Sequence, residues 1–439
     1  GTSMLRSPRQ TFILLAACTC LLATAFATSP QEHLVYTSGG PPNLAGPTST
    51  LISDAAGNLY GTAYVGGNGL CIWSGGAQNG CGSVFELSPP AGGIGPWTEK
   101  VLYSFQGGTD GALPYAGLVM DAAGNLYGAA SVGGDGTSQD LGIIYELSPP
   151  SGGSGAWTFT NLFLFSNTSA DGGSPMGTLI FDHAGNLYGT TSSGGASNDG
   201  AVFKLSPPSA PGGTWTETVL HSFSGADGWF PVAGLYLDGA GNLYGTTVQG
   251  GNMTACGGSG CGVVFKLSPG SGGTWTEMLL HRFARTDGSQ PYGSLTFYHG
   301  NFYGTTFTGS NFAGTVFELT AGHGGPWTLT TIHSFGGPND GGAPYSGVTF
   351  DGSGNLYGTT YGGGSAAQPD GTVYKLSPPS GGAWSETILT NFSQTGAAQG
   401  PIGGLLLKGN KLFGTTSDCN SSFSAGCSIS GNVFAITNF

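Results

Sequence analysis

Residues 182–191 read DHAGNLYGTT, and nearly the same phrase returns as DAAGNLYGTA from Asp54, DAAGNLYGAA from Asp121, DGAGNLYGTT from Asp238 and DGSGNLYGTT from Asp351. Each copy follows an apolar run that ends in Asp, and continues through a Gly-Asn turn into a second run. Runs rich in β-branched and aromatic residues, divided by Gly, Asn and Asp, are typical of strands joined by tight turns. The phrase therefore predicts a hairpin that recurs along the chain.

A longer repeat surrounds this hairpin. Its marker is the glycine of a Tyr-Gly or Phe-Gly pair, which occurs seven times, at Gly61, Gly128, Gly189, Gly245, Gly304, Gly358 and Gly414. Each interval adds two strand-like runs, one reading Val-Phe-x-Leu and one that follows a Trp-Thr pair, so one copy holds four strands. The array predicts an all-β protein, a seven-bladed β-propeller of four-stranded antiparallel blades, with an open solenoid as the alternative.

The two ends of the array predict how the ring closes. The seventh copy stops at Phe439 before its fourth strand, whereas the run at residues 32–38 has no preceding strands of its own. We expect residues 34–37 to pair as the outer strand beside residues 432–437. An N-terminal strand in this place closes the ring and hides an unpaired edge.

The N-terminal segment resembles a secretory signal peptide. A basic start precedes an apolar stretch, and Ala25-Phe26-Ala27 fits a cleavage site. The three residues ahead of Met4 resemble a cloning remnant. We therefore expect residues 1–27 to lie outside the domain and residues 28–439 to form a single propeller that is secreted or held at the cell surface. A lipid tether at Cys18 is the alternative.

The composition excludes several classes of partner. Charged residues make up 8% of the chain, and 10 Lys and Arg stand against 23 Asp and Glu. Without a basic patch to displace phosphate counterions, we expect no nucleic-acid partner. No stretch after the N-terminal segment is apolar for long enough to span a bilayer, so we expect no membrane span. We also expect a monomer.

The pattern GNLYGTT, VFELSPP and WTE, repeated over residues 32–439, resembles the GloVer tandem repeat of bacterial choice-of-anchor surface proteins. Its strand order is similar to that of kelch repeats. The resemblance implies a β-propeller at a bacterial surface and brings no catalytic motif with it. Propellers serve as enzymes, lectins and scaffolds, so the fold alone does not assign a function.

Six cysteines follow the N-terminal segment. They form three pairs that each share one loop: Cys71 with Cys81, Cys256 with Cys261, and Cys419 with Cys427. Shared loops favour three local disulfides, which is consistent with export. No histidine lies near any pair, so we expect no metal site, and we expect no cofactor.

Departures from the repeat point to a ligand site. Loops from the second to the third strand, and from the fourth strand to the next first strand, emerge on one face of a propeller, which we call the upper face. On it, an added Trp-Phe pair at one blade entry adjoins an arginine at the next, and an aromatic ring beside a guanidinium suits a uronic or sialic-type sugar. The predicted ligand-binding residues are Trp73, Trp229, Phe230, Arg285, Asp287, Tyr292 and Phe312.

Other repeated residues have structural interpretations. An Asp-Gly pair precedes the first strand at Asp110, Asp171, Asp227, Asp287 and Asp340, and we interpret it as an Asx turn, with a catalytic or calcium-binding ring as the alternative. We expect His221, His281 and His333, which share one repeat position, to be packing or surface residues. Arg285 either binds a ligand carboxylate or pairs with Asp287.

Three functions fit these features. The first is a non-catalytic binding module for polysaccharide or another envelope component. The second is a polysaccharide hydrolase or lyase with acidic residues at the upper mouth of the channel. The third is a structural adhesion or assembly protein. The sequence contains no nucleophile elbow, phosphate loop or zinc-helix motif, which favours the first.

Overall fold

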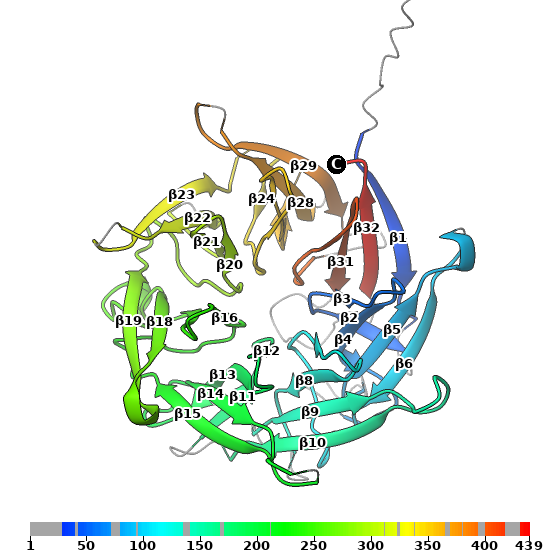
Figure 1. Ribbon diagram of the computed structural model, residues 1–439. Helices are drawn as coiled ribbons and strands as arrows, with labels where there is room; N and C mark the ends of the chain where they lie inside the picture. Colours follow the sequence, from blue (N-terminus) through cyan, green and yellow to red (C-terminus); the bar gives the residue numbers. More distant parts are fainter. Residues whose placement is uncertain are drawn as a thin grey trace, which may run out of the picture.

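The computed structural model describes residues 29–39, 43–71, 80–93, 95–134, 141–166, 171–210, 212–310, 312–322, 325–337, 339–364, 369–379, 381–393, 400–417 and 431–439. Within these ranges, seven antiparallel sheets stand in a ring around a central axis (Figure 1). The predicted seven-bladed β-propeller is confirmed. None of the described residues forms a helix long and apolar enough to cross a membrane.

Blades one to three follow one another along the chain. Blade one contains β2 (Leu44–Pro47), β3 (Ile52–Ser53), β4 (Leu59–Gly66), β5 (Ser83–Ser88) and β6 (Thr98–Ser104). Blade two contains β7 (Val119–Met120), β8 (Leu126–Ala130), β9 (Ile143–Ser148) and β10 (Thr158–Leu164). Blade three contains β11 (Gly172–Pro175), β12 (Ile180–Phe181), β13 (Leu187–Gly194), β14 (Ala201–Ser206) and β15 (Thr216–Ser222).

Blades four to six continue in the same order. Blade four contains β16 (Tyr236–Leu237), β17 (Leu243–Thr247), β18 (Val263–Pro269) and β19 (Trp275–Arg282). Blade five contains β20 (Thr296–Tyr298), β21 (Asn301–Thr306), β22 (Thr315–Thr320) and β23 (Thr328–Ser334). Blade six contains β25 (Thr349–Phe350), β26 (Leu356–Thr360), β28 (Pro369–Ser377) and β29 (Ser385–Ser393), beside a small sheet of β24 (Gly341–Gly342) and β27 (Gly362–Gly363).

Blade seven joins the two ends of the chain. It contains β30 (Leu406–Lys408), β31 (Lys411–Ser417), β32 (Gly431–Thr437) and β1 (Gln31–Thr37). Strand β1 pairs antiparallel with β32, with Leu34 opposite Phe434 and Thr37 opposite Asn432. Figure 1 shows the two strands side by side, β1 in blue and β32 in red. The predicted closure by the N-terminal strand is confirmed.

The repeated Asp organises the hairpin between the first and second strands. In blade four, Asp238 Oδ1 accepts the backbone N–H of Asn242 at 2.8 Å, and Oδ2 accepts the Asn242 side chain at 2.8 Å and the Tyr244 hydroxyl at 3.1 Å. Burial acts to raise the pKa of Asp238, but these hydrogen bonds hold it below its ordinary value. Gly241, with φ of 84°, supplies the left-handed residue of the turn.

The repeated Tyr-Gly glycine lies under an aromatic ring of the third strand. Gly245 pairs directly with Phe265, and a Cβ added to Gly245 would lie 2.6 Å from that ring and 2.8 Å from Leu235. The same arrangement holds at Gly61, where the added Cβ would lie 2.7 Å from Phe85. Only glycine lets the ring fill the centre of the blade, which explains why all seven copies carry it at this position.

Threonines of the second strand connect neighbouring blades near the axis. Thr62 donates a hydrogen bond to the carbonyl of Ala116 in the next blade at 2.9 Å, and Thr305 donates to Ser346 O at 2.8 Å. Equivalent bonds run from Thr190, Thr246, Thr359 and Thr415. Blade two has Ala129 at this position and therefore cannot make the bond. These buried bonds fix the first strands, which surround the channel.

Removing the closing strand tests the ring. Deletion of residues 29–37 exposes the edge of β32, so we expect the melting temperature to fall by roughly 10 °C or more and the protein to self-associate through the open edge. Thermal melting and light scattering measure both effects. A chain that begins at Ser29 is the control and should melt like the full chain. Equal stability of the two truncated chains would contradict closure by β1.

The hairpin carboxylate gives a second test. Asp238→Ala leaves the Asn242 amide and the Tyr244 hydroxyl without their acceptor, so we expect a loss of about 1–3 kcal/mol in the free energy of unfolding. Tyr244→Phe removes one of the four hydrogen bonds that the Asp238 side chain accepts and should cost less. Urea unfolding at neutral pH measures both variants. If Asp238→Ala unfolds at the same midpoint as the wild type, the hydrogen bonds do not hold the hairpin.

Candidate binding site at the channel mouth

In all seven blades, the same short motif leads into the first strand, which lies beside the channel. Each first strand is preceded by Pro, one variable residue, two small residues and then Leu or Val. The variable residues lie at the upper end of a central cavity of about 440 Å³. They are Thr48, Tyr115, Met176, Val232, Tyr292, Tyr345 and Ile402.

The small residues of the motif allow the seven entries to approach one another. A Cβ added to Gly293 would lie 2.5 Å from the backbone nitrogen of Gly347, and one added to Gly347 would lie 2.5 Å from the carbonyl oxygen of Ser294. Hydroxyls of this motif also bond across blades, as Thr178 Oγ1 does with the N–H of Gly117 at 3.1 Å. Larger residues here would push the first strands apart and widen the ring.

Aromatic rings from the entries to blades two, five and six gather at the mouth. Tyr292 stacks on Tyr345 with ring centres 4.4 Å apart and planes at 14°, and Phe307 meets both rings edge-on at 5.6 and 5.8 Å. Tyr115, at the entry to blade two, makes an edge contact with Tyr64 at 5.9 Å. These rings give the cavity an apolar wall with hydroxyl groups at its edge.

The cavity lining is uncharged. Among the described residues that line it, none is Asp, Glu, Lys, Arg or His. Burial, followed by the neighbouring Tyr345 hydroxyl, raises the pKa of Tyr292 to about 12. Burial and the hydroxyls of Tyr345, Tyr64 and Tyr292 raise the pKa of Tyr115 well above its ordinary value. The phenols therefore stay neutral at physiological pH, and the mouth offers rings, hydroxyls and backbone groups to a ligand.

The structure divides the predicted ligand-binding residues into two groups. Phe230 and Tyr292 line the cavity. Arg285 lies outside the lining, with its guanidinium 5.1 Å from the ring centre of Phe312, which is 68% exposed. This pair forms a separate cation–π contact on the loops of blade five.

The two predicted tryptophans lie elsewhere. Trp229 is half-buried, and its backbone pairs with Gln249, donating to Gln249 O at 2.9 Å. Trp73 lies outside the described residues. Sequence reasoning missed the ring of variable entry residues, although the shared Pro-x-small-small motif was a signal that could have found it.

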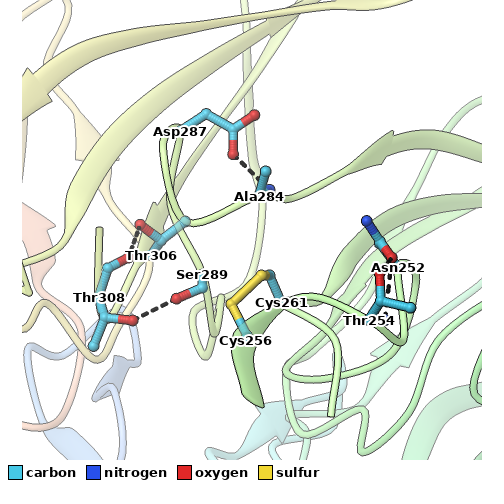
Figure 2. The surroundings of a disulfide bond; sticks show 9 residues. All are labelled: Asn252, Thr254, Cys256, Cys261, Ala284, Asp287, Ser289, Thr306 and Thr308. Atoms are coloured by element: carbon cyan, nitrogen blue, oxygen red, sulfur yellow. Dashed lines mark hydrogen bonds between the residues drawn. A yellow bond between two sulfur atoms is a disulfide. The ribbon is translucent and has the colours of Figure 1, made fainter. Parts of the chain in front are cut away.

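Asp287 belongs to a turn. Its Oδ1 accepts the N–H of Ala284 at 2.8 Å, which Figure 2 shows, and its Oδ2 lies 3.0 Å from Nε2 of His281. The pairing of Asp287 with Arg285 that the sequence left open is therefore replaced by a pairing with histidine. Asp227 and Asp340 accept turn N–H groups in the same way, from Ser224 and Gly336. These aspartates therefore stabilise turns, as the sequence predicted, but they accept from residues three or four positions earlier in the chain, which is not the hydrogen bond of an Asx turn.

Two of the three expected disulfides lie in the described chain. Cys71 is bonded to Cys81, and Cys256 to Cys261, each within one upper-face loop. Figure 2 shows the second of these close to the entry of blade five; the 3-10 turn at Cys256–Gly258 forms part of its loop. Cys419 and Cys427 lie outside the described residues, so their pairing stays a prediction.

Outer strands of adjacent blades meet through polar side chains. At the junction of blades seven and one, Tyr36 donates a hydrogen bond to Glu99, and between blades six and seven Thr390 donates to Glu32 at 2.6 Å. Between blades two and three, Glu217 lies near Asp171, and burial followed by the charge of Asp171 raises the pKa of Glu217 to about 7. The repeat thus places an acidic residue at several junctions, with a different partner at each.

At three junctions, the outer strand of the first blade contributes a histidine. His221 lies between Asp227 and Glu277, His281 beside Asp287, and His333 between Asp340 and Glu386. Burial followed by the charge of Asp227 raises the pKa of Glu277 to about 8. The expectation that these histidines only pack or face solvent is incomplete, because each one faces a carboxylate, and His221 and His333 also face a glutamate of the next blade.

Comparison with known proteins identifies the repeat. A family profile of the Gloeobacter/Verrucomicrobia repeat matches residues 67–255 and 138–337. A search of curated protein sequences found no match.

Among solved structures, the chain is similar to the PQQ-bound form of an aldose sugar dehydrogenase from Streptomyces coelicolor, at 12% identity and a TM-score of 0.44 over 93% of this chain and 98% of that one. It is also similar to a putative oxidoreductase (glucose dehydrogenase) from Thermus thermophilus, at 16% identity and a TM-score of 0.42 over 79% and 99%. At these values no function carries over to this chain.

The Glu217 carboxyl predicts a pH effect on stability. Its folded-state pKa of about 7 lies above the usual 4.5, so the folded protein loses stability as the pH rises from about 4.5 to 7 and the carboxyl ionises. Glu217→Gln does not ionise. We expect the variant to melt roughly a few degrees above the wild type at pH 8, with a smaller difference at pH 5. Glu146→Gln controls for loss of a carboxylate. A pH-independent difference would show that Glu217 does not titrate in this range.

Proposed function

The chain belongs to the Gloeobacter/Verrucomicrobia repeat family, and for this member we propose a non-catalytic binding module that works outside the cell and holds a neutral part of a polysaccharide, or of another envelope component, in its channel mouth. Two loop disulfides support the extracellular location, because such bonds persist in oxidising compartments. The expected signal peptide, which lies outside the described residues, supports it as well.

The observation that carries the proposal is the uncharged, aromatic-lined cavity formed by all seven blade entries. Its volume of about 440 Å³ lies within the range of small-ligand pockets. The ring faces of Tyr292 and Tyr345 and the edge of Phe307 suit the apolar faces of sugar rings. Hydroxyls of Ser294 and Thr178, together with the phenols, supply hydrogen bonds without charge.

This chemistry favours a neutral ligand over an acidic one. The sequence favoured a uronic or sialic-type sugar because Arg285 was expected beside Trp229 and Phe230. Arg285 does lie against Phe312, one of its predicted neighbours, but neither residue lines the cavity. A carboxylate inside the cavity would lose its hydration without gaining a cation.

The hydrolase or lyase alternative receives less support from this site. Such an enzyme needs two carboxyl groups, or an equivalent acid–base pair, on either side of the scissile bond. The described cavity lining offers hydroxyls and no carboxylate.

Binding to the channel mouth can be tested directly. We expect a neutral oligosaccharide chosen from a glycan array to bind the wild type, and Tyr292→Ala or Tyr345→Ala to weaken it by about tenfold or more in calorimetry, through loss of stacking. Arg285→Ala should change the affinity by less than about twofold.

Phe297→Ala, which truncates a 42% exposed aromatic residue in β20, controls for loss of a surface ring. Circular dichroism should show that all four variants fold. If both tyrosine variants bind as the wild type does, the channel mouth is not the site. If only acidic glycans bind and Arg285→Ala abolishes binding, the site lies at the Arg285–Phe312 pair.

A further inference from the structure

Three side chains from two blades converge between blades three and four. His221 belongs to β15, Asp227 to the loop that follows, and Glu277 to β19 of the next blade. Nε2 of His221 lies 3.3 Å from Asp227 Oδ2 and 3.8 Å from Glu277 Oε2. One donor atom from each residue lies within 4.8 Å of the others.

The same constellation occurs two blades further on. His333 of β23 lies 3.6 Å from Asp340 and 3.5 Å from Glu386 of β29, measured from Nε2 to the carboxylate oxygens. All six side chains of the two clusters are half-buried. Because the repeat generates both clusters from the same positions, each one is a separate observation of the same geometry.

Buried ligand atoms in both clusters are poorly paired. Nε2 of His221 and of His333 is enclosed by protein, and the carboxylate oxygens that face it lie 3.3–3.8 Å away without good hydrogen-bond geometry. Oε1 of Glu277 and of Glu386 is also enclosed without a well-formed hydrogen bond. An enclosed polar atom that is poorly paired is costly, so a native protein usually supplies a partner. In each cluster, the imidazole nitrogen and a glutamate oxygen are left poorly satisfied.

The intervening junction shows what happens without the third residue. Between blades four and five, Leu329 occupies the position of Glu277 and Glu386 in the repeat. There His281 forms an ordinary hydrogen bond to Asp287, with Nε2 to Oδ2 at 3.0 Å. The histidine and aspartate are therefore closer where no glutamate faces them, at 3.0 Å, than in the two clusters with a glutamate, at 3.3 and 3.6 Å.

In the two complete clusters, the distance from the histidine nitrogen to each carboxylate is close to that between neighbouring ligands of a metal ion. A tetrahedral Zn²⁺ ion with ligands at about 2.0–2.2 Å places neighbouring ligand atoms about 3.3–3.6 Å apart. The four measured separations, 3.3 and 3.8 Å in one cluster and 3.6 and 3.5 Å in the other, are close to that range. Imidazole nitrogen with carboxylate oxygen suits Zn²⁺ better than Mg²⁺ or Ca²⁺, which favour oxygen alone.

We propose that the protein binds one zinc-type divalent cation at each of these two junctions, through His221, Asp227 and Glu277 and through His333, Asp340 and Glu386. Each ion would join the outer strand of one blade to the outer strand of the next, β15 to β19 in the first cluster and β23 to β29 in the second. This role is independent of ligand binding at the channel mouth. It departs from the sequence-based expectation of no metal site, which considered only histidines near the cysteine pairs.

Metal content of the full chain tests the proposal. After removal of metal with a chelator and re-equilibration with ZnCl₂, gel-filtered protein should retain one zinc ion per cluster by mass spectrometry. Glu277→Gln and Glu386→Gln, which keep the side-chain shape, should each lose one ion, and the double variant should lose both. Zinc should raise the melting temperature of the wild type and leave that of the double variant unchanged.

The junction of blades four and five provides matched controls. Asp287→Asn should keep both ions, and Leu329→Glu, which completes the third cluster, should add one. Circular dichroism establishes that each variant is folded before its zinc content is compared with that of the wild type. If the double variant retains as much zinc as the wild type, or if Asp287→Asn loses zinc to the same extent as Glu277→Gln, the proposal is wrong.

Discussion

At several junctions, a blade is fixed to the next by an aromatic ring of its second strand that lies against the tryptophan of the following blade. Tyr60 meets Trp157, Tyr303 meets Trp384, and Phe413 of blade seven meets Trp97 of blade one, with ring centres 5.9–6.4 Å apart. A blade on its own would leave both of its faces exposed, so this contact is only satisfied in a complete ring. The threonine bonds near the axis, which run from one blade to the next, depend on the blades being held at this spacing.

Much of this fold is predictable because its signals are local and repeated. An Asp, a Gly-Asn turn and Tyr-Gly-Thr occur within ten residues, and seven copies average out the irregularities of any one. Closure also follows from the sequence, since one strand is missing at the C-terminus and one is surplus at the N-terminus. The sequence did not reveal that the hairpin Asp accepts the hydroxyl of the Tyr two residues beyond the Asn, as Asp238 does from Tyr244.

The sites were harder to predict because they combine residues from different copies. The channel mouth takes one variable residue from each of seven entries, and each of them looks like ordinary repeat variation when its copy is read alone. The junction clusters join a histidine of one blade to a glutamate of the next, and Leu329 shows that one substitution is enough to remove the third group. Arg285 was unusual in the sequence, but its orientation toward Phe312 depends on loop geometry that the repeat does not specify.

The pairing of β1 with β32 has a consequence for biosynthesis. The outer strand of blade seven is among the first parts of the propeller to leave the ribosome, and its partner, which ends at Thr437, is among the last. Blades one to six can assemble in order during translation or translocation, but the ring stays open until nearly the whole chain has emerged. Contacts between residues so far apart in sequence form slowly. The nascent protein therefore carries β1 without its partner until β32 has emerged, and the pairing of these two strands is the last step that closes the ring.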